Sequence, residues 1–71
     1  MENNRYAQHK DLIREISDQQ GVDIGVACAM LRDRMGWTFE GTEGIDKEIT
    51  EFCDFCSRMS AEERRTYFYG A

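Results

Sequence analysis

Apolar residues recur at intervals of three or four in three segments of the chain, and a fourth, shorter segment ends in consecutive aromatic residues. This spacing places apolar side chains on one face of a helix. The three stripes consist of Tyr6, His9, Leu12, Ile13 and Ile16, then Ala27, Met30, Leu31 and Met35, then Ile45, Ile49, Phe52, Cys53, Cys56 and Met59. The pattern therefore predicts an all-α protein.

Capping residues set the expected ends of these helices. Asn4, Asp23 and Thr42 stand just before the three striped segments, where a side-chain oxygen can accept a hydrogen bond from a free backbone N–H. Ser60 opens a Ser-x-x-Glu capping box ahead of the fourth segment. The expected helices cover residues 4–20, 24–35, 43–58 and 61–69 and pack as a small bundle in a single helical domain, 1–71.

The size of the chain affects how its stability is expected to arise. A domain of 71 residues without disulfides or metal has a net stability of only about 3–5 kcal/mol. The second expected helix, 24–35, is apolar nearly all round. It is therefore either wrapped by the other helices or buried against a second subunit or another protein, and we expect a homodimer.

Negative charge is concentrated in one part of the sequence. The net charge is −5, and residues 38–54 contain six acids and one base, Lys47, so this segment carries the whole excess. We expect Glu43, Glu51 and Asp54 on the exposed side of the third helix. Such a face can be solvated and maintain solubility, or it can dock a basic partner through electrostatic steering. We expect it to dock a partner.

Aromatic residues add further candidate contacts. Tyr67, Phe68 and Tyr69 are consecutive and follow two arginines, and tyrosine and arginine are common at binding hot spots. Three neighbouring aromatics cannot all face one core, so at least one should point outward or cover a neighbouring chain. The alternative is that two of them cover the base of the bundle and one tyrosine is partly exposed. Trp37 lies in an expected loop. The predicted partner-binding residues are Glu40, Glu43, Glu51, Asp54, Trp37, Arg65, Tyr67 and Tyr69.

Residues 13–32 resemble a bacterial helix-turn-helix. The match rests on Ile16, Ser17, Gly21, Val22, Asp23, Ala27 and Leu31. The resemblance implies two helices that cross closely at a glycine turn and, as an alternative function, a dimeric transcriptional regulator that binds DNA. However, the positions that would read bases are Ile24, Gly25, Val26, Cys28 and Ala29. None of these can make a bidentate base contact, so we expect no nucleic-acid ligand.

Cysteine and histidine are the candidates for chemistry. Cys53 and Cys56 form a C-x-x-C, which would need two further zinc ligands, and Cys28 and His9 are the remaining sulfur and nitrogen donors. Free cysteines on an apolar stripe commonly pack as small hydrophobic residues. A Cys–His nucleophile would also need an orienting group and an oxyanion site. We expect core cysteines, no metal, no cofactor and no enzymatic activity.

The remaining features concern location. The chain has no apolar run of about 18 residues, the length that spans a membrane, and its polar N-terminus is unlike a secretory signal. Three cysteines do not suit a disulfide framework. We therefore expect a cytoplasmic regulator or inhibitor that binds a protein partner with a basic surface and does not contact membranes.

Overall fold

A computed structural model describes residues 3–70, and all the regular structure within that range is helical. The helices are α1 (Arg5–Gln8), α2 (Lys10–Gln20), α3 (Ile24–Met35), α4 (Lys47–Ser57) and α5 (Ala61–Tyr69). The prediction of an all-α bundle is confirmed. None of the helices within residues 3–70 has the length and apolar character needed to cross a bilayer.

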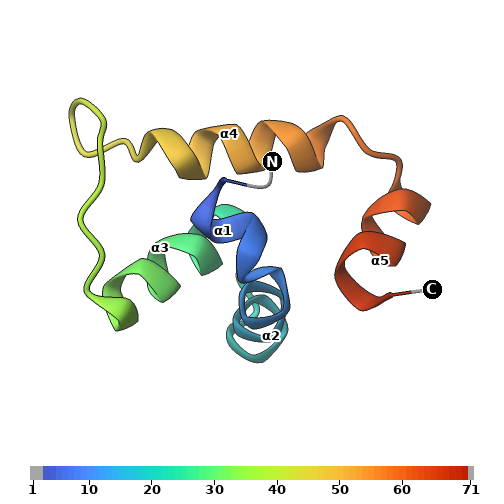
Figure 1. Ribbon diagram of the computed structural model, residues 1–71. Coiled ribbons are helices and arrows are strands. Elements are labelled where there is room, and N and C mark those ends of the chain that lie inside the picture. The colour runs from blue at the N-terminus through green and yellow to red at the C-terminus, as the bar shows by residue number, and fades with distance from the viewer. Residues whose placement is uncertain (1–2, 71) are drawn as a thin grey trace.

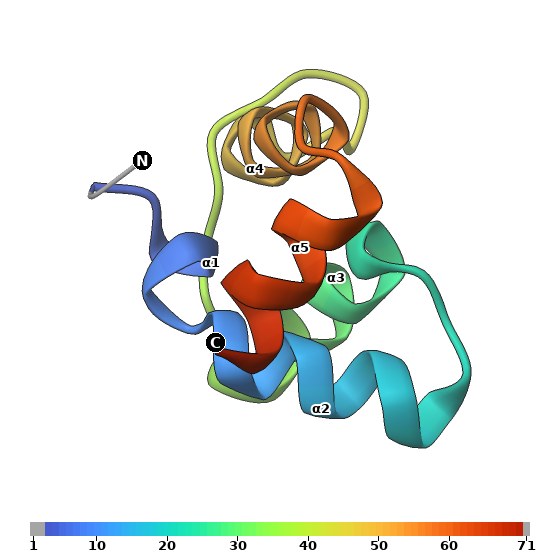
Figure 2. The ribbon, with the colours of Figure 1, turned by 90° about the vertical axis from the view of Figure 1, so that its right-hand side faces the viewer.

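The helices surround a single small core. Figure 1 shows α4 along one side of the molecule and α2 on the other, with α1 and α3 between them. α3 packs against both α2 and α4, and α5 returns to pack against α2. Figure 2 is viewed from the end of the molecule where α5 lies, and shows α5 in front of the bundle, between α4 and α2. The loop from residue 36 to residue 46 lies at the far end from α5.

The first predicted helix is wrong in one respect, because it is broken at His9. His9 has φ −117° and ψ 30°, and its backbone N–H donates to the carbonyl of Tyr6. Contacts with α4 hold the first turn. Asn4 caps α1 and also donates from Nδ2 to the carbonyl of Glu48 at 2.9 Å. These contacts fix the direction of α1 separately from that of α2, although the apolar period continues through the break.

The third predicted helix begins later than expected. Its N-cap is Asp46, not Thr42, and α4 starts at Lys47. Glu43 and Gly44 have φ values of 57° and 77°, a left-handed conformation that cannot continue a right-handed helix. The other predicted ranges, 24–35 and 61–69, agree with α3 and α5, and the capping box at the start of α5 is present.

The buried core comes from all five helices. It consists of Tyr6, Ile13, Ile16, Ala27, Cys28, Leu31, Phe52, Cys56 and Phe68. Three residues of the predicted stripes are instead exposed, namely Leu12, Met35 and Ile45. Ile45 lies in the loop, so the late start of α4 removes it from the stripe. Met35 is the last residue of α3 and precedes the exposed Gly36.

Candidate functional site

A buried polar cluster joins α1, α3 and α4. The Tyr6 hydroxyl donates to Asp46 Oδ2 at 2.6 Å, and Arg32 Nη1 lies 3.2 Å from the same oxygen. The other carboxylate oxygen accepts the backbone N–H groups of Glu48 and Ile49 at 2.9 and 3.4 Å and so caps α4. One side chain therefore orders the start of α4 and ties it to two other helices.

The electrostatics of this cluster indicate a structural role. Burial opposes ionisation of Asp46, but hydrogen bonds from Tyr6, Arg32 and the two backbone amides outweigh it and lower the pKa of the carboxyl. Burial, and then the hydrogen bond to Asp46, raise the pKa of Tyr6 far above its usual value. Tyr6 is fully buried, and Asp46 already accepts four hydrogen bonds, so the pair has no room for a substrate.

Trp37 is packed into the same region. Its ring lies edge-on to Tyr6 and to His9, with centroids 5.7 and 5.2 Å apart. The guanidinium of Arg5 lies 4.9 Å from the Trp37 ring, pairs with Glu48 at 3.2 Å and donates to the carbonyl of Thr38 at 2.9 Å. Trp37 thus anchors the loop to α1, and only part of its surface is open to a partner.

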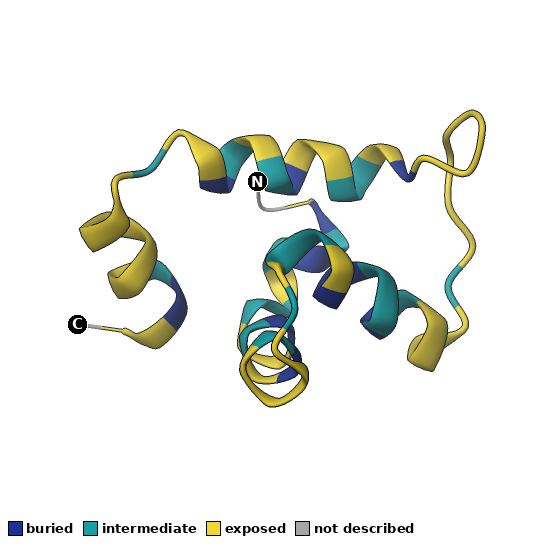
Figure 3. Cartoon of the chain, turned by 180° about the vertical axis from the view of Figure 1, so that it is seen from behind, coloured by how far each residue is buried: buried dark blue, intermediate teal, exposed yellow. Residues whose placement is uncertain are grey.

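The predicted acidic residues belong to the loop and to α4. Glu40, Glu43, Glu51 and Asp54 are all exposed, and none of them is ion-paired within residues 3–70. Figure 3 shows that the outward edge of α4 is exposed and its inward edge is buried. We call these four residues the acidic surface. Lys47 is also exposed on this side, so the surface is negative but not uniformly so.

A cleft lies next to the acidic surface, between the loop and the start of α4. Its volume is about 490 Å³, and it is lined by Arg5, Thr38, Phe39, Glu40, Lys47 and Glu48. Phe39 remains 38% exposed, with the guanidinium of Arg32 4.3 Å from its ring. The loop thus offers an aromatic side chain in the same cleft as the unpaired carboxylate of Glu40, a combination that the spacing of acids alone did not predict.

The C-terminal residues form a separate surface. Tyr67 is half-buried and its ring contacts Phe55 and Phe68, with centroids 5.4 and 5.0 Å apart. Tyr69 is 59% exposed and its hydroxyl donates to Asp18. Arg65 is exposed. Thus two aromatics cover the end of the core and one tyrosine is exposed, which agrees with the alternative interpretation of the three consecutive aromatics.

These two groups of predicted residues do not meet. The loop and α5 lie at opposite ends of the molecule (Figure 1), and α5 packs against α2 and not against the outer side of α4. An interface that covered both would have to extend along α4 from the loop to the α5 end of the molecule. The residues that sequence reasoning missed are Lys10 and Arg14, which reach Tyr67 and Tyr69 from α2.

The cysteines lie at the contact between α3 and α4. Cys28 and Cys56 are buried and Cys53 is partly buried, and all three are free thiols. Burial raises the pKa of each thiol, that of Cys56 to about 11. Thiols in this state are poor nucleophiles, which fits the predicted packing role. Within residues 3–70, histidine, cysteine and acidic side chains form no cluster of three that could hold a metal ion.

The turn between α2 and α3 has the geometry that the helix-turn-helix resemblance implies at this corner. Gly21 is left-handed with φ 66°, and the Ser17 hydroxyl donates to the carbonyl of Val22. In Figure 1, α2 is seen end-on while α3 runs across the view, so the helices cross steeply. In the first two turns of α3 the exposed side chain is Val26, which has no hydrogen-bonding group for a base.

Comparisons of the chain with protein-family models, with curated proteins and with solved structures gave no match.

Proposed function

We propose that this protein is a non-enzymatic regulator or inhibitor that binds a basic surface of another protein through its acidic surface. The observation that carries the proposal is that Glu40, Glu43, Glu51 and Asp54 are exposed and unpaired. Free carboxylates on one side attract a cationic patch and fix the orientation of docking.

The use made of other carboxylates supports this proposal. Asp46 caps α4 and holds Tyr6 and Arg32, Glu48 pairs with Arg5, and Glu63 belongs to the capping box of α5. These acids stabilise the fold. Within residues 3–70, the side chains of the acidic surface form no helix cap and no ion pair, so they can contact a partner without loss of an internal interaction.

The state of the candidate reactive groups supports a non-enzymatic role. His9 Nδ1 donates to the carbonyl of Arg5 at 2.8 Å, and the His9 ring packs against Trp37. The thiols have raised pKa values. A histidine and thiols held in this way are not arranged as a nucleophile and its base. Free thiols also fit a reducing compartment, and we place the protein in the cytoplasm.

A homodimer is also part of the proposal, through the outer side of α3. Val26 is 45% exposed there, and Ala29 and Met30 are partly exposed. A helix that keeps apolar residues on its outward side gains stability when a second subunit covers it.

The corner at Gly21 favours a second candidate, a helix-turn-helix regulator. Its α3 would have to read bases with Val26 and Ala29, and the net charge of −5 opposes a polyanion. A salt-dependent shift of duplex DNA by the purified protein would favour this candidate over the first.

The test of the first candidate is affinity capture from native cytosol with mass spectrometry. The test variant carries Glu43→Lys, Glu51→Lys and Asp54→Lys. The control carries Glu15→Lys, Gln20→Lys and Glu62→Lys, which are exposed positions away from the acidic surface and make nearly the same change in net charge. We expect a protein with a basic patch to be captured by wild type and control and lost by the test variant, with helicity unchanged. Equal capture by all three would refute the docking role.

A further inference from the structure

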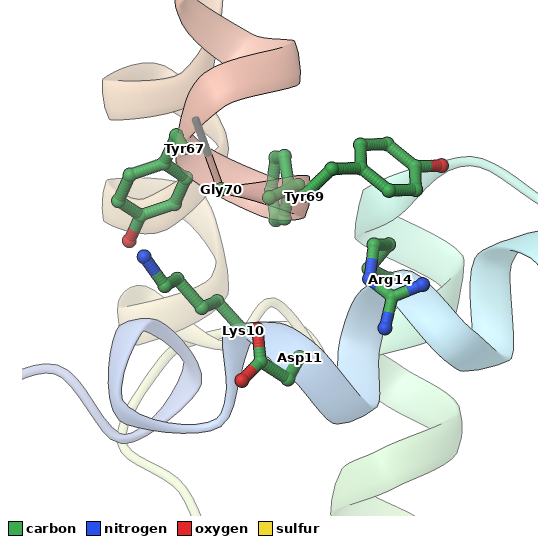
Figure 4. Close-up of a pocket in the computed structure, with 7 residues that line it drawn as sticks. Lys10, Asp11, Arg14, Tyr67, Tyr69 and Gly70 are labelled. Carbon is green, nitrogen blue, oxygen red and sulfur yellow. The ribbon is translucent and has the colours of Figure 1, made fainter.

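A cleft of about 580 Å³ separates α2 from the end of α5. Figure 4 shows that side chains from both helices close over it in two pairs. Lys10 Nζ lies 4.2 Å from the centre of the Tyr67 ring, and Arg14 Cζ lies 5.0 Å from that of Tyr69. Each pair combines a cation of α2 with an aromatic ring of α5, so two cation–π contacts link the helices that border the cleft.

A second hollow of about 270 Å³ adjoins this cleft and shares Arg14, Phe68 and Tyr69 with it. We call the two adjoining hollows the α2/α5 groove. The second hollow also contains Ile24 and Ala61, and its other basic residues are Arg64 and Arg65. The groove therefore combines apolar surface with guanidinium groups.

The charge of the groove is opposite to that of the whole protein. Its basic residues are Lys10, Arg14, Arg64 and Arg65, and its acidic residues are Asp11 and Asp18. Asp18 is already engaged by Arg14 at 3.7 Å and by the Tyr69 hydroxyl at 3.0 Å. Within residues 3–70, no ion pair engages Lys10, Arg64 or Arg65. Lys10 faces the Tyr67 ring, so within the described residues the groove offers two arginines without an ion-pair or cation–π partner, Arg64 and Arg65, on a protein of net charge −5.

We infer that the α2/α5 groove binds an acidic peptide segment of a partner protein, with carboxylates on Arg64 and Arg65 and an apolar side chain against Ile24 and Phe68. Arginine binds carboxylates through two parallel hydrogen bonds, and the exposed Tyr69 adds rigid contact area. This inference goes beyond the proposed function, because the acidic surface would bind a partner of opposite charge at another place.

Charge and surface chemistry favour a peptide over a nucleic acid. A phosphate backbone would meet Asp11 and Asp18 within the groove and a net negative protein around it, and phosphate contacts dominate nucleic-acid affinity. A short peptide presents a few carboxylates locally. It can also place a leucine or phenylalanine side chain on the apolar surface formed by Ile24 and Phe68.

The experiment uses the full ¹⁵N-labelled chain and a synthetic library of short peptides, each with one Leu or Phe anchor flanked by Glu. We expect amide shifts within residues 10–18 and 61–70 on titration, and weaker binding at higher salt. Replacing the anchor with Ser should weaken binding, because the apolar contact is lost. A peptide library with Lys in place of Glu should give no shifts there.

Two matched variants decide the role of the arginines. Arg64→Glu/Arg65→Glu should weaken binding of the best peptide at least tenfold, whereas Arg34→Glu/Lys47→Glu, with the same change in net charge away from the groove, should bind as wild type does. All four positions are exposed, and circular dichroism checks that each variant is folded. Any one of three results would overturn the inference. The first is equal binding by both variants, and the second is an absence of groove shifts with every acidic peptide. The third is a single-stranded oligonucleotide that binds the groove more tightly than the peptides do.

Discussion

Replacement of Asp46 by alanine should remove most of the stability of the protein. The change deletes the N-cap of α4, which costs about 0.5–2 kcal/mol by itself. It also leaves the buried Tyr6 hydroxyl and the Arg32 guanidinium without their acceptor. Breaking a buried ion pair from one side costs about 3–5 kcal/mol. Arg32 is 17% exposed in its side chain, so water can partly solvate it and reduce that cost.

These contributions share one carboxylate and do not add in full, so we expect a loss of about 3–4 kcal/mol in the free energy of unfolding. A domain of this size has only about 3–5 kcal/mol in total. The variant should therefore be largely unfolded at room temperature in about 1 M urea, a condition in which the wild-type chain stays folded. Urea denaturation followed by far-UV circular dichroism measures the difference directly.

Two further variants separate the contributions. Asp46→Asn keeps a capping oxygen but loses the charge that faces Arg32, so its loss should be intermediate. Tyr6→Phe should destabilise the wild-type chain by about 1–2 kcal/mol, but should cost little or nothing in the Asp46→Ala background, where the hydroxyl has already lost its acceptor. As a control, Glu51→Ala on the exposed side of α4 should change stability by less than about 0.5 kcal/mol. A loss of under about 1 kcal/mol for Asp46→Ala would show that Asp46 acts only as a cap and would refute the account of the cluster.

Stability should depend on pH at both ends of the range. Folding lowers the pKa of Asp46, so its contribution to the free energy of unfolding is present above its unfolded value of about 4 and is lost as pH falls through the lower folded value. Folding raises the pKa values of the thiols and Tyr6, so their contributions are lost as pH rises above about 8.5 for the thiols and above about 10 for Tyr6. The urea midpoint should thus be flat from about pH 5 to 8 and fall on either side; in Tyr6→Phe the fall above about pH 10 should be smaller, and an unchanged alkaline limb would contradict this assignment. Light scattering at low micromolar concentration should give a dimer mass that Val26→Glu on the outer side of α3 converts to a monomer mass; a wild-type monomer would remove the proposed dimer.

The parts of the fold that could be predicted from sequence are those that local chemistry decides. Asp23 and Gly36 bound α3, and Ser60 opens α5, through interactions within one helical turn. Ser17 and Gly21 shape the corner between α2 and α3 in the same local way. For these elements a short stretch of sequence contains all the interacting partners.

The errors arise where distant residues decide. Asp46 replaces Thr42 as the cap of α4 because Tyr6, 40 positions away, and Arg32, 14 positions away, hold its carboxylate. The break at His9 depends on the contact of Asn4 with α4. Nothing in the spacing along the chain connects these residues, so the sequence pattern favoured the longer helices.

The candidate sites follow the same division. The exposure of Glu51 and Asp54 could be predicted because they lie opposite the apolar stripe of one helix. The α2/α5 groove could not, because Lys10 and Arg14 reach Tyr67 and Tyr69 only when α5 packs back on α2. The tail was therefore predicted to share a basic partner with the acidic surface, whereas its basic neighbours favour an acidic ligand.

The most direct measurement of the proposed function is a titration of the ¹⁵N-labelled protein with the captured partner, followed by amide chemical shifts. We expect the largest shifts on the loop from residue 40 to residue 46 and on the outward residues of α4, at Glu51 and Asp54, and we expect these shifts to diminish with added salt. Shifts confined to other helices, or shifts of the loop and α4 that are insensitive to salt, would contradict the proposed docking role.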